Sequence, residues 1–80
     1  MTKKEIIQKL NNSCEVNEIC ENHYSYHNSF YGTYYIFHVT DRQVVILKLT
    51  ELNHRISIKH YGSQHFGLFY DYWKDKLFNR

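Results

Sequence analysis

Residues 33–50 read TYYIFHVTDRQVVILKLT, and this stretch decides the fold. It holds two runs rich in Tyr, Ile, Phe and Val, Thr33–Thr40 and Gln43–Thr50, which only Asp41-Arg42 separates. Aromatic and β-branched residues favour strands, and a connector this short joins antiparallel strands. A third run of the same character, His54–Tyr61, follows another short connector. The sequence therefore predicts a three-stranded antiparallel meander.

The alternation within these runs predicts which side of the sheet is buried. In the second strand Val45, Leu47 and Leu49 share a face, and in the third Ile56 and Ile58 share one. We expect that face to form the core. The first strand is apolar on both sides, which suits a central position or a covered outer face. If the chain leaves the outer face uncovered, we expect a homodimer, because monomers seldom tolerate such a patch.

Helical patterns flank the predicted sheet. Thr2-Lys3-Lys4-Glu5 fits a capping box, and the apolar residues after it lie at helical spacing, which predicts a helix over residues 3–11. A last helix is predicted after Gly62-Ser63 and runs through the C-terminus. The residues that should lie across the apolar face of the sheet are Phe66, Phe69, Tyr70, Trp73 and Leu77.

The segment between the first helix and the sheet carries weaker signals. A short helical turn is predicted there, with Val16, Ile19 and Cys20 facing inward and three glutamates facing water. Residues 22–32 lack a clean period and are predicted to form an ordered, tyrosine-rich loop. The expected fold is therefore α+β, a single domain over residues 1–80. It has an N-terminal helix, a three-stranded antiparallel meander and a C-terminal helix packed on one sheet face.

The length and composition of the chain limit the classes of protein to which it can belong. The chain has 80 residues, enough for one domain, and its aromatic content of 18% compensates for a short core. It lacks Ala and Pro and is rich in residues of AT-rich codons, which points to an AT-rich bacterium, or to a phage or mobile element replicating in one. No apolar run is long enough to span a bilayer. We expect a cytoplasmic protein of a bacterial or phage-infected host cell, without a membrane partner.

Charge is segregated along the chain. Between Lys9 and Arg42 there is no Lys or Arg, whereas this segment holds four acidic residues and many Tyr, His and Asn residues. Segregation of this kind in a small chain favours recognition. Tyrosine offers a large contact area, and carboxylates steer a protein toward a basic surface. The predicted partner-binding residues are Glu15, Glu18, Glu21, Tyr24, Tyr26 and Tyr31.

A second hypothesis is direct binding of nucleic acid, which ranks behind protein binding. Basic groups between aromatic rings hold single strands through phosphate pairing and base stacking. The order helix–three strands–helix resembles double-stranded-RNA-binding domains in topology only. Those domains begin the last helix with lysines, where this chain reads Ser63-Gln64-His65-Phe66-Gly67. The residues expected on the outer sheet face are Tyr34, His38, Lys48, Arg55, Lys59 and Tyr61.

No motif in the chain predicts catalysis. It lacks a Gly-rich phosphate loop, an H-E-x-x-H pair and a serine in a nucleophile elbow, so we expect no enzyme. The strongest metal candidates are two cysteines and two histidines, whose spacing matches no standard zinc finger. The alternative is one buried thiol with solvated histidines. We expect no cofactor and no metal at Cys14, Cys20, His23 and His27.

These patterns predict a small non-enzymatic binding protein. Its partner would be a host protein with a basic surface, such as a nucleic-acid-binding protein, and the acidic segment would block that surface. In its size, acidic patch and lack of motifs the chain resembles anti-CRISPR proteins and similar counter-defence inhibitors of phages and mobile elements. The resemblance is one of functional class, since no motif ties the chain to a single family.

Overall fold

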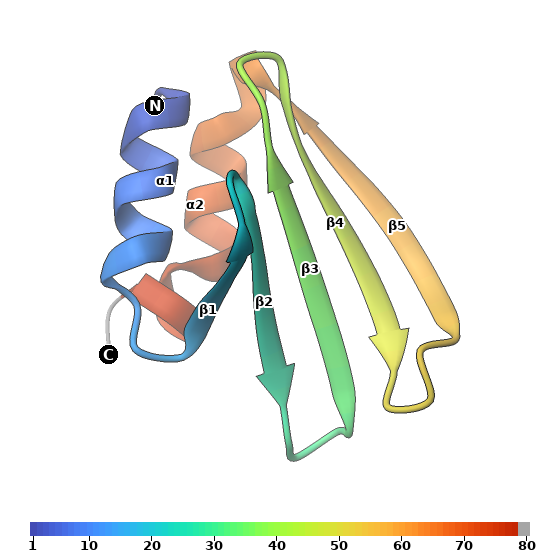
Figure 1. Cartoon of the computed structure of the whole chain (residues 1–80). Helices are drawn as coiled ribbons and strands as arrows, with labels where there is room; N and C mark the ends of the chain where they lie inside the picture. Colours follow the sequence, from blue (N-terminus) through green and yellow to red (C-terminus); the bar gives the residue numbers. More distant parts are fainter. Residues whose placement is uncertain (79–80) are drawn as a thin grey trace.

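The computed structural model describes residues 1–78, which form one five-stranded sheet, with a helix before it and a helix after it in the chain. All neighbouring strands are antiparallel, and their order in the sheet is β1-β2-β3-β4-β5. Both helices lie on the same side of the sheet (Figure 1). The elements are α1 (Lys3–Asn12), β1 (Val16–Cys20), β2 (His23–Asn28), β3 (Thr33–Val39), β4 (Gln43–Thr50), β5 (Arg55–Gly62), a short 3-10 helix (Ser63–His65), α2 (Phe66–Trp73) and a π-helix (Lys74–Phe78).

The α+β class is confirmed, but the sheet has five strands where three were predicted. The three predicted strands correspond to β3, β4 and β5. Strands β1 and β2 occupy the segment that was predicted to form a helical turn and a loop, so both of those predictions are wrong. The predicted turn and loop would leave most backbone groups of this segment to water, whereas strand pairing satisfies them within the sheet.

Two local features explain the additional strands. In β2, Tyr24 and Tyr26 are buried and alternate with more exposed polar residues, which is the period of two of a half-buried strand. Asn22 lies in the turn between β1 and β2 with a φ of 64°. Asn tolerates this left-handed conformation better than most residues do, so Glu21-Asn22 can form a tight turn.

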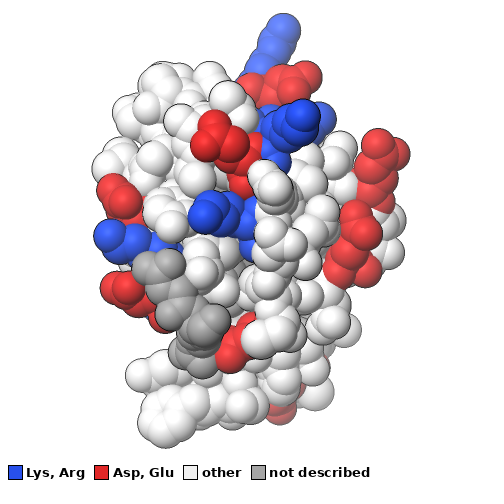
Figure 2. Space-filling model, turned by 90° about the vertical axis from the view of Figure 1, so that its left-hand side faces the viewer, with Lys and Arg blue, Asp and Glu red and all other residues white. Residues whose placement is uncertain are grey.

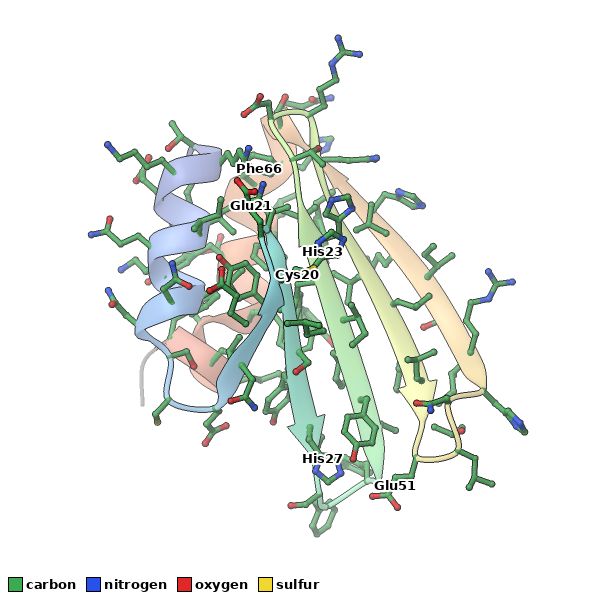
Figure 3. All side chains as sticks on the ribbon, in the orientation of Figure 1. Cys20, Glu21, His23, His27, Glu51 and Phe66 are labelled. Carbon is green, nitrogen blue, oxygen red and sulfur yellow. The ribbon has the colours of Figure 1, made fainter. Side chains whose placement is uncertain are left out.

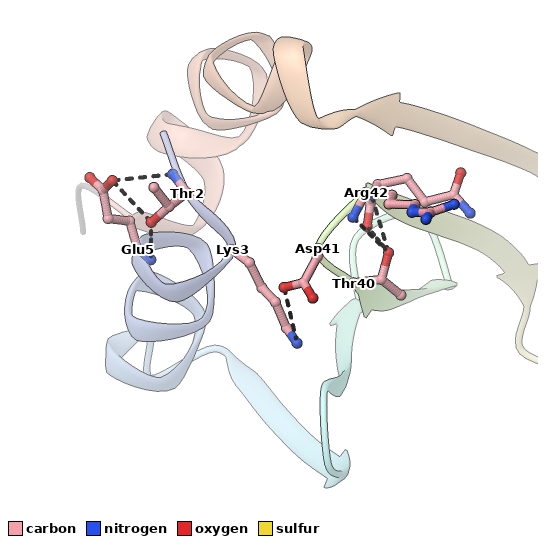
Figure 4. A network of polar contacts seen from close by, with 7 residues as sticks. Thr2, Lys3, Glu5, Thr40, Asp41 and Arg42 are labelled. Carbon is pink, nitrogen blue, oxygen red and sulfur yellow. Dashed lines mark hydrogen bonds and ion pairs between the residues drawn. The ribbon is translucent and has the colours of Figure 1, made fainter.

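Helix α1 begins where the sequence signals predicted, whereas α2 begins at Phe66, after the 3-10 helix, without a side-chain cap. The hydroxyl of Thr2 accepts a hydrogen bond from the backbone N–H of Glu5, whose carboxylate accepts one from the backbone N–H of Thr2 at 3.1 Å (Figure 4). The predicted capping box is therefore confirmed. At the other end of α1, Ser13 Oγ donates a buried hydrogen bond of 2.8 Å to the backbone oxygen of Leu77. Within residues 1–78, no helix has the length and apolar character needed to cross a membrane.

In β4 and β5 the buried face of the sheet is opposite to the predicted one. Val44 and Ile46 of β4 face the helices and are buried, in register with Val39 and Phe37 of β3. Both rows of β4 are apolar, so its alternation alone does not select a face, and a shift of one residue exchanges the two. The predicted core residues that lie outside the buried core are Val45, Leu47, Leu49, Ile56 and Ile58.

The predicted position of the last helix, across the sheet, is confirmed. Phe66, Phe69 and Trp73 of α2 are buried, and so is Leu77 in the π-helix that follows, whereas Tyr70 is only half-buried and stacks on Phe78. The ring of Phe37 makes edge-on contacts with Phe69 and Trp73, with centroids 6.0 Å and 5.1 Å apart. Edge-to-face pairs of this kind add to the free energy gained from burial. Aromatic packing therefore forms much of the small core.

Tyr24 gives this core a pH dependence. Burial raises the pKa of Tyr24 above its usual value of 10.0, and Glu18 raises it further, while a hydrogen bond from the Asn11 side chain lowers it. The folded state thus holds this proton more tightly than the unfolded chain does. The contribution to stability is complete below about pH 10 and is lost as the pH rises through the folded-state pKa.

We therefore expect the free energy of unfolding to decrease above about pH 10. Urea titrations at a series of pH values measure this decrease. The variant Tyr24→Phe has no hydroxyl at this position and should lose less free energy over the same range. An equal decrease in the two proteins would contradict the assignment to Tyr24.

Candidate functional site

Two of the tyrosines predicted to bind a partner belong to the core. Tyr24 and Tyr26 are 1% and 8% exposed, because they are the inward positions of a strand and not part of a loop. They are not available to a partner of the folded protein, so this part of the prediction is wrong. Tyr31 is exposed, in the turn between β2 and β3, beside Phe30, which is 85% exposed.

The three glutamates predicted to steer a partner lie along an edge strand of the sheet. Glu18 is in β1, and Glu15 and Glu21 lie just before and just after that strand. No Lys or Arg occurs in β1, β2 or β3, so this edge is acidic. Figure 2 shows the side of the molecule that carries the helices, where basic and acidic side chains are mixed and acidic ones alone lie along one margin.

The predicted nucleic-acid-binding residues do not form one surface. Tyr34 and His38 alternate with buried residues of β3 and lie on the face away from the helices. The lysines lie on the other face, because the buried side of β4 and β5 is opposite to the predicted one. Lys48, Lys59 and Tyr61 are on the helix side, and Arg55, paired with Leu49, begins β5.

We call the uncovered side of strands β2 to β5 the open face. Its central row contains Ile36, Leu47 and Ile58, which are direct neighbours across β3, β4 and β5. Ile58 is 48% exposed, and the other two are half-buried. The row on one side consists of His38, Val45 and His60, and the row on the other side consists of Tyr34, Leu49 and Arg55. Within these rows Arg55 is the one permanently charged residue.

Aromatic and imidazole rings line the β2 margin of the open face. The rings of His23 and His38 are stacked with centroids 4.0 Å apart, and those of His27 and Tyr34 with centroids 4.3 Å apart. Nε2 of His27 lies 3.1 Å from the carboxylate of Glu51 (Figure 3). The open face therefore has an aliphatic centre and an aromatic margin that can exchange hydrogen bonds.

Sequence patterns indicated an apolar outer face in the first predicted strand, but they assigned the β4 and β5 part of the open face to the core. Two aliphatic rows in β4 were a signal that one of them lies on a second apolar surface. Aromatic neighbours distinguish the two rows of β4, because Ile46 is in register with Phe37 and Val44 is in register with Tyr61. Large rings on adjacent strands indicate the row that meets the aromatic residues of α2.

The four metal candidates are not brought together. Cys20 pairs with His23 across β1 and β2, whereas His27 lies at the other end of β2 and contacts Glu51 (Figure 3). Cys14 lies in the connection between α1 and β1. In the described part of the chain, no group of three or more His, Cys, Asp and Glu residues is arranged to hold a metal ion.

A hollow beside the start of α1 contains few groups suited to catalysis. It measures about 660 Å³ and lies between the start of α1 and the turn that joins β3 to β4. Its carboxylate, Asp41, forms an ion pair of 3.6 Å with Lys3 (Figure 4). Of the described residues that line it, none is a His or Cys, and the remaining ionisable side chain is Lys4.

The chain matches no family model, and neither the curated proteins nor the solved structures contain a match. The predicted resemblance in topology to double-stranded-RNA-binding domains is wrong, because five strands and not three lie between the helices. Function must therefore be inferred from the surfaces of this chain.

Proposed function

We propose that this chain is a small non-enzymatic binding protein that binds a partner protein through its open face. The observation that carries this proposal is the composition of that face, which is aliphatic and uncharged at its centre and has no covering element within residues 1–78. Exposed apolar patches of this kind mark interaction sites in soluble proteins. The centre of an interface is also depleted in charge, as the centre of the open face is.

The acidic edge indicates the chemistry of the partner. Strand β1 adjoins β2, and Glu15, Glu18 and Glu21 make it negative. A protein surface with an apolar patch beside basic residues would complement both the open face and this edge. We propose a host protein with such a surface, for example a nucleic-acid-binding one, which the chain blocks as a phage-type counter-defence inhibitor would. Composition, with neither Ala nor Pro, supports a phage or mobile-element origin.

The size of the open face favours such a partner over a second copy of the chain. Four strands with about seven residues each give an area of about 450 Å² from the usual strand spacings. Stable complexes bury about 800 Å² on each partner. Two copies packed face to face would bury little beyond the open face. A larger partner that also contacts the acidic edge can reach the usual size.

Footprinting of a reconstituted complex tests this proposal. The polypeptide captured from host lysate is purified, recombined with the chain and exposed to hydroxyl radicals. Side chains of the open face, including Leu47 and Ile58, should become protected, while exposed residues of α1 such as Gln8 should react as in the free chain. Protection confined to the helices would overturn the proposal. So would a parent protein that sediments as a dimer with the open face protected.

The glutamates of the acidic edge can be tested separately. Replacing Glu15, Glu18 and Glu21 together with Gln should change stability little, since surface substitutions usually change it by no more than about 0.5 kcal/mol each. We expect association with the partner to become slower and less sensitive to salt, with a smaller effect on dissociation. Stopped-flow association at low salt measures this change. An unchanged association rate would show that the glutamates do not steer binding.

A further inference from the structure

A second site lies on the helix side of the sheet. Helix α2 leaves part of β4 and β5 uncovered there, and a pocket of about 180 Å³ remains. Lys59 is exposed at this position although it lies on the helix side. We call this hollow the Lys–Tyr pocket. The residues that characterise it are Tyr35, Lys48, Lys59, Tyr61, Tyr72 and Trp73.

Three lysine amino groups lie over aromatic rings at this pocket. Lys48 Nζ is 5.7 Å from the ring centroid of Tyr35, and Lys59 Nζ is 5.6 Å from that of Tyr72. Lys76 Nζ, from the π-helix, is 4.3 Å from the same Tyr72 centroid. Among the residues described, none of these lysines has a carboxylate within 4.0 Å. Their charges are therefore available to an anion.

Trp73 adds a buried hydrogen-bond donor to the lining. Its side chain is 3% exposed and packs edge-on against Tyr35, with ring centroids 5.0 Å apart. The indole N–H has no hydrogen-bond partner within the described part of the chain. A buried donor without a partner is uncommon and costs free energy.

We propose that the Lys–Tyr pocket binds one nucleotide unit of a single-stranded nucleic acid. The lysines would hold phosphate, and a base would stack on the ring of Tyr72, which is 55% exposed, by displacing a lysine side chain that lies over it. The pocket is smaller than the roughly 300–1,000 Å³ of sites that enclose free small molecules. A polymer that passes over it needs to insert only one phosphate or base. This site shares no residue with the open face, so either proposal can fail alone.

Titration with short oligothymidylate and oligouridylate tests this site. The fluorescence anisotropy of a label on the oligomer reports binding. Quenching of the fluorescence of Trp73, the single Trp of the chain, reports entry of a group into the pocket. We expect both oligomers to bind at low salt and to quench Trp73. Lys48→Gln combined with Lys59→Gln should weaken binding at least about tenfold at low salt. The same double variant should also reduce the slope of the logarithm of the association constant against the logarithm of the salt concentration by about 1.4. This is about 0.7 for each lost phosphate contact.

Two further variants distinguish binding at the Lys–Tyr pocket from general attraction to positively charged side chains. Lys4→Gln combined with Lys9→Gln removes the same charge from α1, which lies at the far side of the molecule from β5 (Figure 1). This control should change affinity less than about twofold, because distant surface charges are screened. Tyr72→Leu should weaken binding at least about fivefold through lost stacking, with the salt slope unchanged.

Three results would overturn the proposal. The first is that neither oligomer binds at low salt. The second is that the α1 variant loses as much affinity as the pocket variant. The third is that a polyglutamate peptide binds and quenches Trp73 as strongly as the oligonucleotides, which would mean that charge alone is recognised.

Discussion

Replacing Trp73 with alanine should unfold the protein. This side chain is 3% exposed and makes edge-on contacts with Tyr35 and Phe37, at centroid distances of 5.0 Å and 5.1 Å. Truncating a buried Trp costs about 3–5 kcal/mol. A single hydrophobic core in a chain of about 80 residues or fewer rarely supplies more than about 3–5 kcal/mol, so this loss is comparable with the whole stability of the protein. We expect no cooperative thermal transition in circular dichroism.

The neighbouring residue in α2 provides the control. Tyr72 is 55% exposed and contacts Trp73 from outside the core. Tyr72→Ala should therefore retain a cooperative transition near that of the parent, since exposed substitutions usually have small effects. If Trp73→Ala also melted cooperatively within a few degrees of the parent, α2 would have to dock on the sheet by a different face.

Elements with strong local signals could be predicted from the sequence, and those without them could not. The capping box of Thr2 and Glu5 marked α1, and aliphatic runs marked β3 to β5. Strand β2 contains no aliphatic residue and is buried through Tyr24 and Tyr26. Tyrosine occurs in cores, interfaces and loops alike, because it joins a large ring to a hydroxyl. Composition alone therefore could not place this segment in the sheet.

The candidate sites depended on which face of each strand meets the helices. Strand β4 is apolar on both faces, so its pattern allowed either assignment. The choice is made by tertiary packing, because Ile46 is in register with Phe37, which contacts the rings of α2. The reversed assignment of β4 and β5 places Lys48 and Lys59 on the helix side and Leu47 on the open face. Basic groups between aromatic rings are present, but in the Lys–Tyr pocket and not on the outer face.

Leu47→Lys should abolish partner binding through the open face while the protein remains folded. Leu47 is half-buried at the centre of that face, between Ile36 and Ile58. In the free protein a lysine there can lay its methylene groups along the sheet and keep its amine in water. In the complex the same amine would be buried without a partner. An uncompensated buried charge costs about 3–5 kcal/mol, which corresponds to a loss of at least about 100-fold in affinity.

Two control variants test whether the position of the added charge matters, and not merely that a charge was added. Gln8→Lys adds the same charge to an exposed position of α1 and should bind as the parent does. Leu47→Met keeps the open face apolar and should retain most of the affinity, because swaps of similar volume usually cost less than about 1.5 kcal/mol. Calorimetry with the purified partner measures all three variants. If Leu47→Lys bound with unchanged affinity, the partner would have to use another surface. If the parent were a dimer that this substitution converts to a monomer, a second copy would occupy the open face.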